Sequence, residues 1–168
     1  NRNDGGLIII TERSYIEENL VTFNGQPSTR NIYHDHDLNI IDINSDGEIE
    51  WARNIHKKQS STEDYGFFNS YFLINTGNNI VLIYNDNIKN TLDVKPKDYK
   101  LYSGVFTDGV VIAAILNKNG NLERTELFTT KDKEGIIKTK NSIEIAPNTL
   151  LSVAQRGKKF QFIKIEFT

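Results

Sequence analysis

Most of this sequence consists of short apolar runs, many alternating with polar residues and separated by dipeptides that favour tight turns. Such runs are typical of β-strands, whereas apolar residues at helical spacing are scarce. The turn dipeptides are Asp46-Gly47, Thr76-Gly77, Asp108-Gly109, Asn119-Gly120 and Arg156-Gly157. The pattern predicts an all-β fold built from antiparallel strands.

The predicted strands cover most of the chain. They are Leu7–Thr11, Asp37–Ile43, Glu48–Ile55, Phe67–Ile74, Ile80–Tyr84, Gly104–Leu116, Asn121–Thr129, Ser142–Ile145, Leu150–Gln155 and Lys159–Phe167. Two longer connections remain, Thr11–Arg30 and Asn85–Tyr99. The only stretch with a helical pattern, enough for a turn or two, is Tyr15–Leu20.

Similar segments recur at nearly one period along the chain. Asn44–Glu50 aligns with Asn117–Glu123 and Gly6–Ile10 with Asn79–Ile83, each at an offset of 73, while Ser70–Ile74 and Ser142–Ala146 are 72 apart. We therefore expect a single domain, 1–168, of four-stranded repeat units at roughly 1–60, 67–130 and 141–168. Repeated four-stranded antiparallel units form β-propellers. Because two and a half units cannot close a ring, the prediction is a partial, propeller-like fold, and a β-sandwich or open barrel is the alternative.

Three short motifs extend this interpretation. Asp4-Gly5-Gly6 precedes an aliphatic strand, Asp46–Ala52 forms a hairpin, and Ile83–Asp86 ends a strand. Together they resemble repeats in large exported bacterial proteins of unassigned function. The resemblance implies a propeller-like module that is secreted, periplasmic or on the cell surface, and it transfers no catalytic residues. Because the chain starts without methionine, we expect it to be a mature or trimmed part of a longer polypeptide.

Composition narrows the function classes. The 168 residues carry 20 basic and 22 acidic side chains, which argues against a nucleic-acid-binding surface. No apolar run approaches the roughly 20 residues that span a bilayer, and the absence of cysteine excludes disulfides and thiolate sites. Nucleophile-elbow and phosphate-loop motifs are also missing. We expect a non-catalytic module that acts as a scaffold or binds a protein or glycan.

The histidines His34, His36 and His56 suggest an alternative function. His34 and His36 point to one face of a strand. If opposite residues of the following hairpin sum to 92, His36 lies opposite His56. Three imidazoles with an open fourth position suit a catalytic zinc, so the alternative is a metal-dependent hydrolase. The simpler interpretation is three exposed histidines without metal.

The same register follows from the turn Asn44-Ser45-Asp46-Gly47, which predicts a three-residue loop with Gly47 left-handed and Asn44 paired with Glu48. Ile43 then faces Ile49, Ile41 faces Trp51 and Asp42 faces Glu50. Calcium is the metal that the acidic side chains of this hairpin would bind, through Asp42, Asn44, Asp46 and Glu50. Arg53 occupies the position where a calcium loop needs a bidentate glutamate, so a solvated acidic turn is the alternative.

The densest aromatic segment, Tyr65–Phe72, offers a ligand-binding surface through Tyr65, Phe67 and Tyr71. Exposed rings stack on sugars and anchor interfaces, so a carbohydrate-binding module is another alternative, and burial in the core is the simpler one. The repeat also predicts exposed edge strands at Leu7–Thr11 and Lys159–Phe167. These edges would pair with another chain or with a segment missing from this one.

Overall fold

The protein is described by a computed structural model covering residues 5–90, 94–104, 108–132 and 134–167. Over these residues it is an all-β protein of three antiparallel four-stranded sheets, none closed into a barrel. Two 3-10 turns, Pro96–Asp98 and Thr139–Asn141, are its only helical elements, and no helix in these ranges is long and apolar enough to cross a bilayer.

Each sheet comes from a contiguous part of the chain. The first sheet contains β1 (Leu7–Phe23), β2 (Gln26–Ile43), β3 (Ile49–Ile55) and β4 (Gln59–Thr62). The middle sheet contains β5 (Phe72–Asn75), β6 (Asn79–Asn87), β7 (Gly109–Asn117) and β8 (Leu122–Thr129). The last sheet contains β9 (Ile136–Ile137), β10 (Ile143–Ala146), β11 (Thr149–Arg156) and β12 (Lys159–Glu166). The short strands β4 and β9 were not expected from the sequence. The predicted strand Phe67–Ile74 begins only at Phe72.

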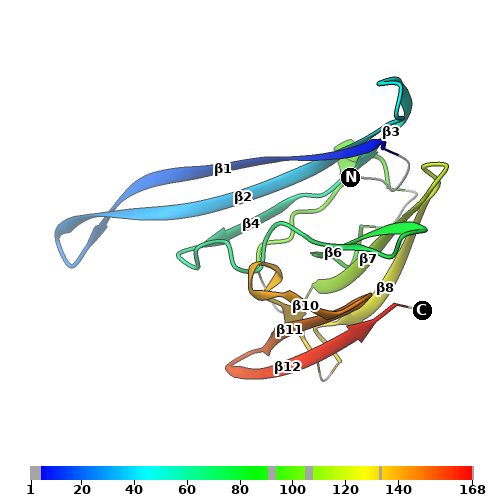
Figure 1. Ribbon diagram of the computed structural model, residues 1–168. Coiled ribbons are helices and arrows are strands. Elements are labelled where there is room, and N and C mark those ends of the chain that lie inside the picture. The colour runs from blue at the N-terminus through cyan, green and yellow to red at the C-terminus, as the bar shows by residue number, and fades with distance from the viewer. Residues whose placement is uncertain (1–4, 91–93, 105–107, 133, 168) are drawn as a thin grey trace.

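The three sheets are stacked, with the middle sheet between the other two (Figure 1). One core joins Leu38 and Ile40 of β2 to the middle sheet, and a second joins the middle sheet to Leu150 and Ala154 of β11. Both faces of β6 and β7 are therefore buried. This explains why these two strands are almost continuously apolar instead of alternating.

The strands β1 and β12 are edge strands, as the sequence predicted. Within the described residues, β1 pairs only with β2, and β12 pairs only with β11. Both therefore present an unpaired backbone edge. The strands at Leu7–Thr11 and Lys159–Phe167 were expected at these edges.

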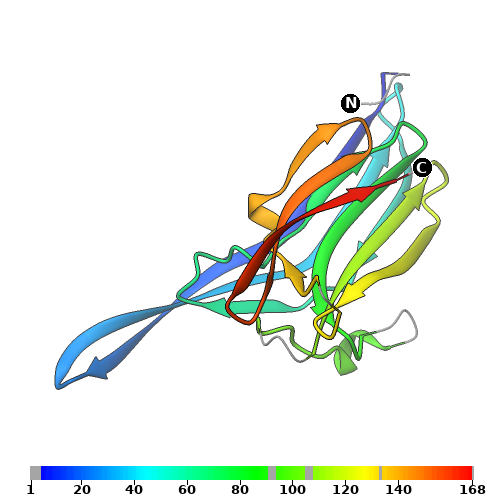
Figure 2. The same cartoon turned by 90° about the horizontal axis from the view of Figure 1, so that it is seen from below.

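The segment expected to be a connection with a turn of helix is instead a long hairpin. β1 continues through Tyr15–Leu20 to Phe23, and β2 returns from Gln26 in antiparallel register that is regular as far as the pair Ser14 and Asp35, before a bulge between Ser14 and Glu12. Asn24 and Gly25 form the tight turn, with φ angles of 50° and 76°. The helix prediction is wrong because the Asn-Gly turn makes the flanking residues strand partners. Residues 16–31 of this hairpin, which we call the arm, project away from the stacked sheets (Figures 1 and 2).

The turn between β2 and β3 has the predicted form. The backbone N–H of Asn44 donates to the Glu48 carbonyl oxygen at 2.9 Å, and Gly47 is left-handed, with a φ of 85°. Ile43 lies opposite Ile49. The sequence thus predicted the loop and its first pair correctly.

Beyond that pair the predicted register is wrong. A bulge at Glu50 shifts the pairing by one residue, so that Asp42 lies opposite Trp51 and Ile41 lies opposite Ala52. Like charges are therefore not aligned across these strands. The bulge also moves the Trp51 side chain to the face that packs on the middle sheet.

Contacts with the middle sheet account for the bulge. The indole Nε1 of Trp51 donates to the Lys118 carbonyl oxygen at 3.0 Å, and Arg53 Nε donates to the Gly120 carbonyl oxygen at 2.6 Å. In the regular register both side chains would point away from these acceptors. The hairpin β7–β8 keeps the regular register from Leu122 to Glu126, and its bulge comes only at Leu127.

Candidate functional site

The arm carries the most exposed of the large apolar side chains in the described structure, Leu20. Leu20 is 88% exposed, Phe23 is 71% exposed and Ile16 is 59% exposed. Ile16 and Leu20 share one face of the arm, and Phe23 lies on the other. Apolar side chains exposed on both faces of a projecting hairpin indicate an interaction site, since exposed apolar surface on soluble proteins is often functional. The arm is therefore a candidate binding element. Its sequence signal was Asn24-Gly25, a strong hairpin dipeptide inside the supposed connection.

An aromatic group lies where the arm joins the sheets. Tyr65 is 72% exposed; its ring centroid lies 6.4 Å from that of Tyr33 in β2 and 5.9 Å from that of Phe67. The ring planes are tilted by 41° and 53°, so they do not form the flat platform expected for stacking on a sugar. This surface borders the arm, because Tyr33 lies opposite Ile16.

The predicted ligand-binding residues are brought together only in part. Tyr65 and Phe67 are neighbours, whereas Tyr71 packs against the core between the first and middle sheets. Strand alternation does not apply to Tyr65–Tyr71, because this segment forms turns in which Tyr65 and Ser70 have positive φ angles. Burial raises the pKa of the Tyr71 hydroxyl, with Glu12 as a further cause.

The three histidines do not converge. His34 and His36 are neighbours, with ring centroids 5.8 Å apart, and the ring of Tyr15 stacks on His34. His56 instead lies 3.5 Å from a carboxylate oxygen of Asp37. The predicted pairing of His36 with His56 is thus wrong, since the bulge at Glu50 shifted the register.

The acidic hairpin is organised by its own backbone. Oδ1 of Asn44 accepts hydrogen bonds from the backbone N–H groups of Asp46 and Glu48, at 3.0 and 2.8 Å. Asn117 makes the same two bonds in the related turn. Asp42 is buried on the face toward the middle sheet, and the bulge separates it from its expected partner Glu50. In the described part of the chain, no three His, Asp or Glu side chains are arranged to hold a metal ion.

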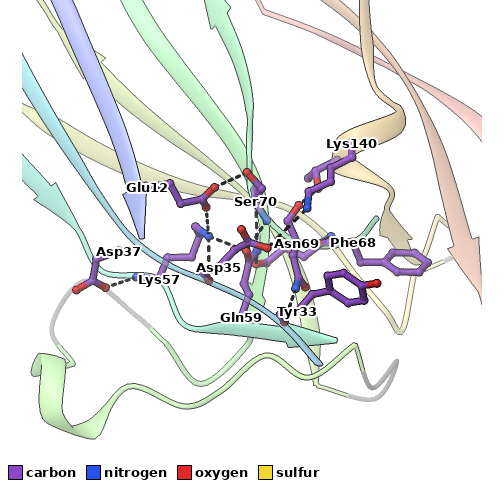
Figure 3. Close-up of polar contacts among 12 residues, drawn as sticks. Glu12, Tyr33, Asp35, Asp37, Lys57, Gln59, Phe68, Asn69, Ser70 and Lys140 are labelled. Atoms are coloured by element: carbon purple, nitrogen blue, oxygen red, sulfur yellow. Dashed lines mark hydrogen bonds and ion pairs between the residues drawn. The ribbon is translucent and has the colours of Figure 1, made fainter. Parts of the chain in front are cut away.

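Behind the base of the arm lies a buried polar cluster centred on Lys57 (Figure 3). The Lys57 ammonium lies 2.6 Å from a carboxylate oxygen of Glu12, 2.6 Å from Oε1 of Gln59 and 3.2 Å from the Asp35 carbonyl oxygen. Burial lowers the pKa of Lys57, and the adjacent Glu12 carboxylate opposes that effect. An ammonium has three protons, and three acceptors surround this one.

The cluster joins the first sheet to the middle one. The Ser70 hydroxyl donates to Glu12 Oε2 at 2.5 Å, and the Ser70 backbone N–H donates to Gln59 Oε1 at 2.7 Å. Nε2 of Gln59 donates to the Asn85 carbonyl oxygen in β6 at 2.7 Å. Ser70 is thus a hydrogen-bond donor to a carboxylate already paired with an ammonium. This arrangement does not activate it as a nucleophile.

Asn85 continues the connection to the last sheet. Its side-chain amide donates to the Ile137 carbonyl oxygen at 2.7 Å and accepts from the Ile137 N–H at 3.2 Å, as a neighbouring strand would. Lys140 lies 3.8 Å from the Asp35 carboxylate, which is buried in β2. The cluster therefore fastens all three sheets to one another at the base of the arm.

A second buried pair lies between the first and middle sheets. Nη2 of Arg124 lies 2.7 Å from a carboxylate oxygen of Asp86, whose other oxygen accepts from Asn90 at 2.8 Å. Burial raises the pKa of Asp86, against the opposing effects of Asn90 and Arg124. The adjacent cavity, lined in part by His56 and Tyr99, measures about 180 Å³. That is smaller than the roughly 300–1,000 Å³ typical of small-molecule sites.

Comparison of the chain with protein-family models, with curated protein sequences and with solved structures found no match. The function is therefore inferred from the arrangement of the residues themselves.

Proposed function

We propose that this chain is a non-catalytic β-module of an exported protein, built from propeller-like repeat units, which acts as a scaffold and presents the arm to a protein partner. The observation that carries the proposal is the exposure of Leu20, Phe23 and Ile16 on a hairpin that extends beyond the stacked sheets (Figure 2). Burying a side chain of this size stabilises a complex by about 1.5–3 kcal/mol relative to its exposed state.

The buried polar cluster supports a scaffolding role. Its charged groups, Glu12 and Lys57, form an ion pair with each other, and the side-chain amides of Gln59 and Asn85 donate hydrogen bonds from one sheet to the next. A rigid base limits the entropy lost when an extended element binds a partner. The cluster thus accounts for how a projecting hairpin would keep its direction relative to the stack.

The repeat supports the propeller-like part of the proposal. The turns at Asn44 and Asn117, 73 residues apart, use the same asparagine to bind the same two backbone N–H groups. Each repeat unit would correspond to one sheet of the stack. Export is proposed from the resemblance of the motifs to exported repeat proteins.

Site-specific photo-crosslinking tests the arm. A photoreactive amino acid at position 20 or 23 is expected to yield one discrete crosslinked product with a different protein in cells that produce the chain. The same probe at Lys158, in the exposed turn between β11 and β12, is the control. A product at position 158 but not on the arm, or a product on the arm only with a second copy of the chain, would contradict the proposal.

A further inference from the structure

The outer face of the first sheet, turned away from the middle sheet, is apolar, and none of the residues that the structure describes covers it. Leu7 is 41% exposed, Ile9 is 36% exposed and Ile49 is 65% exposed. Ile41 and Ile43 lie on the same face, because Ile9 lies opposite Ile41 and Leu7 lies opposite Ile43. We call these five residues the leading face.

Each residue of the leading face has a counterpart 73 positions later in the middle sheet. The counterparts, in order, are Ile80, Leu82, Ala114, Leu116 and Leu122. The cross-strand pairs correspond as well, since Ile80 lies opposite Leu116 and Leu82 lies opposite Ala114. All five counterparts pack into the core between the first and middle sheets. The leading face is thus built like a surface that, one repeat later, is covered by a sheet.

The last sheet carries an apolar face on the opposite side of the stack that no part of the described structure covers. Phe162 is 77% exposed and Ile143 is 57% exposed, and they share this face with Val153 and Leu151, their respective cross-strand partners. We call these four residues the trailing face. In the middle sheet the corresponding side, which contains Ile74, is covered by the last sheet.

We propose that the trailing face of one copy of this chain packs on the leading face of a second copy, and the reverse, so that two copies form a closed dimer. At both contacts between sheets within the chain, the side of one sheet that corresponds to the trailing face packs on the side of the next sheet that corresponds to the leading face. Two copies would supply six sheets, within the range of about four to eight sheets that closed propellers contain. A head-to-tail contact that closes after two copies covers both apolar faces of each copy. The inference rests on the repeat relation in the proposed function and does not depend on the arm.

Light scattering after size-exclusion chromatography tests this on the wild-type chain over a range of concentrations. The expected mass is twice the 19.2 kDa of one chain. Ile9→Glu on the leading face and Phe162→Glu on the trailing face should each give a monomer. Circular dichroism should remain that of the wild type, because both side chains are exposed. Leu7→Glu and Ile143→Glu provide a second variant for each face, and Leu20→Glu on the arm should remain dimeric.

Mixing the two monomeric variants separates this arrangement from other dimers. The Ile9→Glu chain retains an intact trailing face and the Phe162→Glu chain an intact leading face. The mixture should therefore recover a dimer that contains one of each. A wild-type chain that stays monomeric, an open-ended assembly, or variants that do not associate when mixed would overturn the proposal. Loss of the arm crosslink with the dimer retained would contradict only the proposed function.

Discussion

The Trp51 indole N–H donates to the Lys118 carbonyl oxygen at 3.0 Å and so joins the first hairpin turn region to its counterpart in the next repeat. Gly120, two residues further on, lies directly beneath the indole. A Cβ atom added at Gly120 would lie 2.5 Å from Cδ2 of Trp51. The contact between the first two sheets therefore requires glycine at this position.

Gly120→Ala is expected to destabilise the protein more than Gly47→Ala, although both glycines occupy the same place in related turns. Both have positive φ angles, 70° and 85°, so each alanine incurs about 1–2 kcal/mol of backbone strain. Only Gly120 also meets the indole, because a Cβ at Gly47 has nothing within 4 Å. Overpacking adds about 1–3 kcal/mol. Urea denaturation of the two variants measures the difference, and equal losses would contradict the contact.

Lys57→Met is expected to reduce the free energy of unfolding by about 3–5 kcal/mol, since it leaves the Glu12 carboxylate without its buried partner. Adding Glu12→Gln should restore part of the loss, because the double variant no longer buries an unpaired charge. The exposed pair Lys89–Asp108 is the control, and Lys89→Met should have little effect. Chemical denaturation of the wild type, the single variants Lys57→Met and Glu12→Gln, the double variant and the Lys89→Met control tests this. Strictly additive losses would show that Lys57 and Glu12 are not coupled.

Acidification is expected to destabilise the fold through His36. Burial lowers the pKa of His36 below 6.5, with the positive charges of Arg13, His34 and Lys57 as further causes. The unfolded chain therefore binds this proton more tightly than the folded protein does. The contribution of His36 is complete above pH 6.5 and is lost as the pH falls from 6.5 through the lower folded value. NMR titration of the three imidazoles should find this pKa below 6.5. His36→Gln should make stability less dependent on pH in that window, and an unchanged pH dependence would contradict this prediction.

Shortening the arm is expected to leave the stacked sheets intact. Removing residues 19–22 and 27–30 deletes four cross-strand pairs and retains the Asn24-Gly25 turn in register. The deleted side chains are mostly exposed, so the free energy of unfolding should change by less than about 1 kcal/mol. The same variant should lose the crosslinks made from the arm. A large loss of stability would mean that the arm belongs to the core of the fold.

Features of this fold that depend on residues close together in the sequence were predictable. The loop from Asn44 to Gly47 follows from turn chemistry, and so does the pairing of Ile43 with Ile49. The arm was predictable in principle from Asn24-Gly25. Its apolar residues alternate poorly, however, because neither face of the arm packs on a sheet within the described ranges.

The candidate sites depended on contacts that the sequence does not contain. Trp51 reaches Lys118, 67 residues away, and this contact goes with the bulge that removes His56 from His36 and Glu50 from Asp42. The polar cluster brings Glu12 to Ser70 across 58 residues. Sequence periodicity does not indicate such partners, because it relates residues within one strand or helix, and these partners belong to different elements.

By itself the sequence determined an all-β chain, the turn from Asn44 to Gly47 and the edge strands β1 and β12, since alternation and turn residues act within a few positions. Only the tertiary structure decided which apolar faces are covered. Ile80 and Leu7 occupy equivalent positions, yet the first is buried and the second exposed, because a sheet packs on one and none of the described residues packs on the other. Burial depends on the neighbouring sheet rather than on the residue type, and this is why the exposed faces emerged only once the stack was assembled.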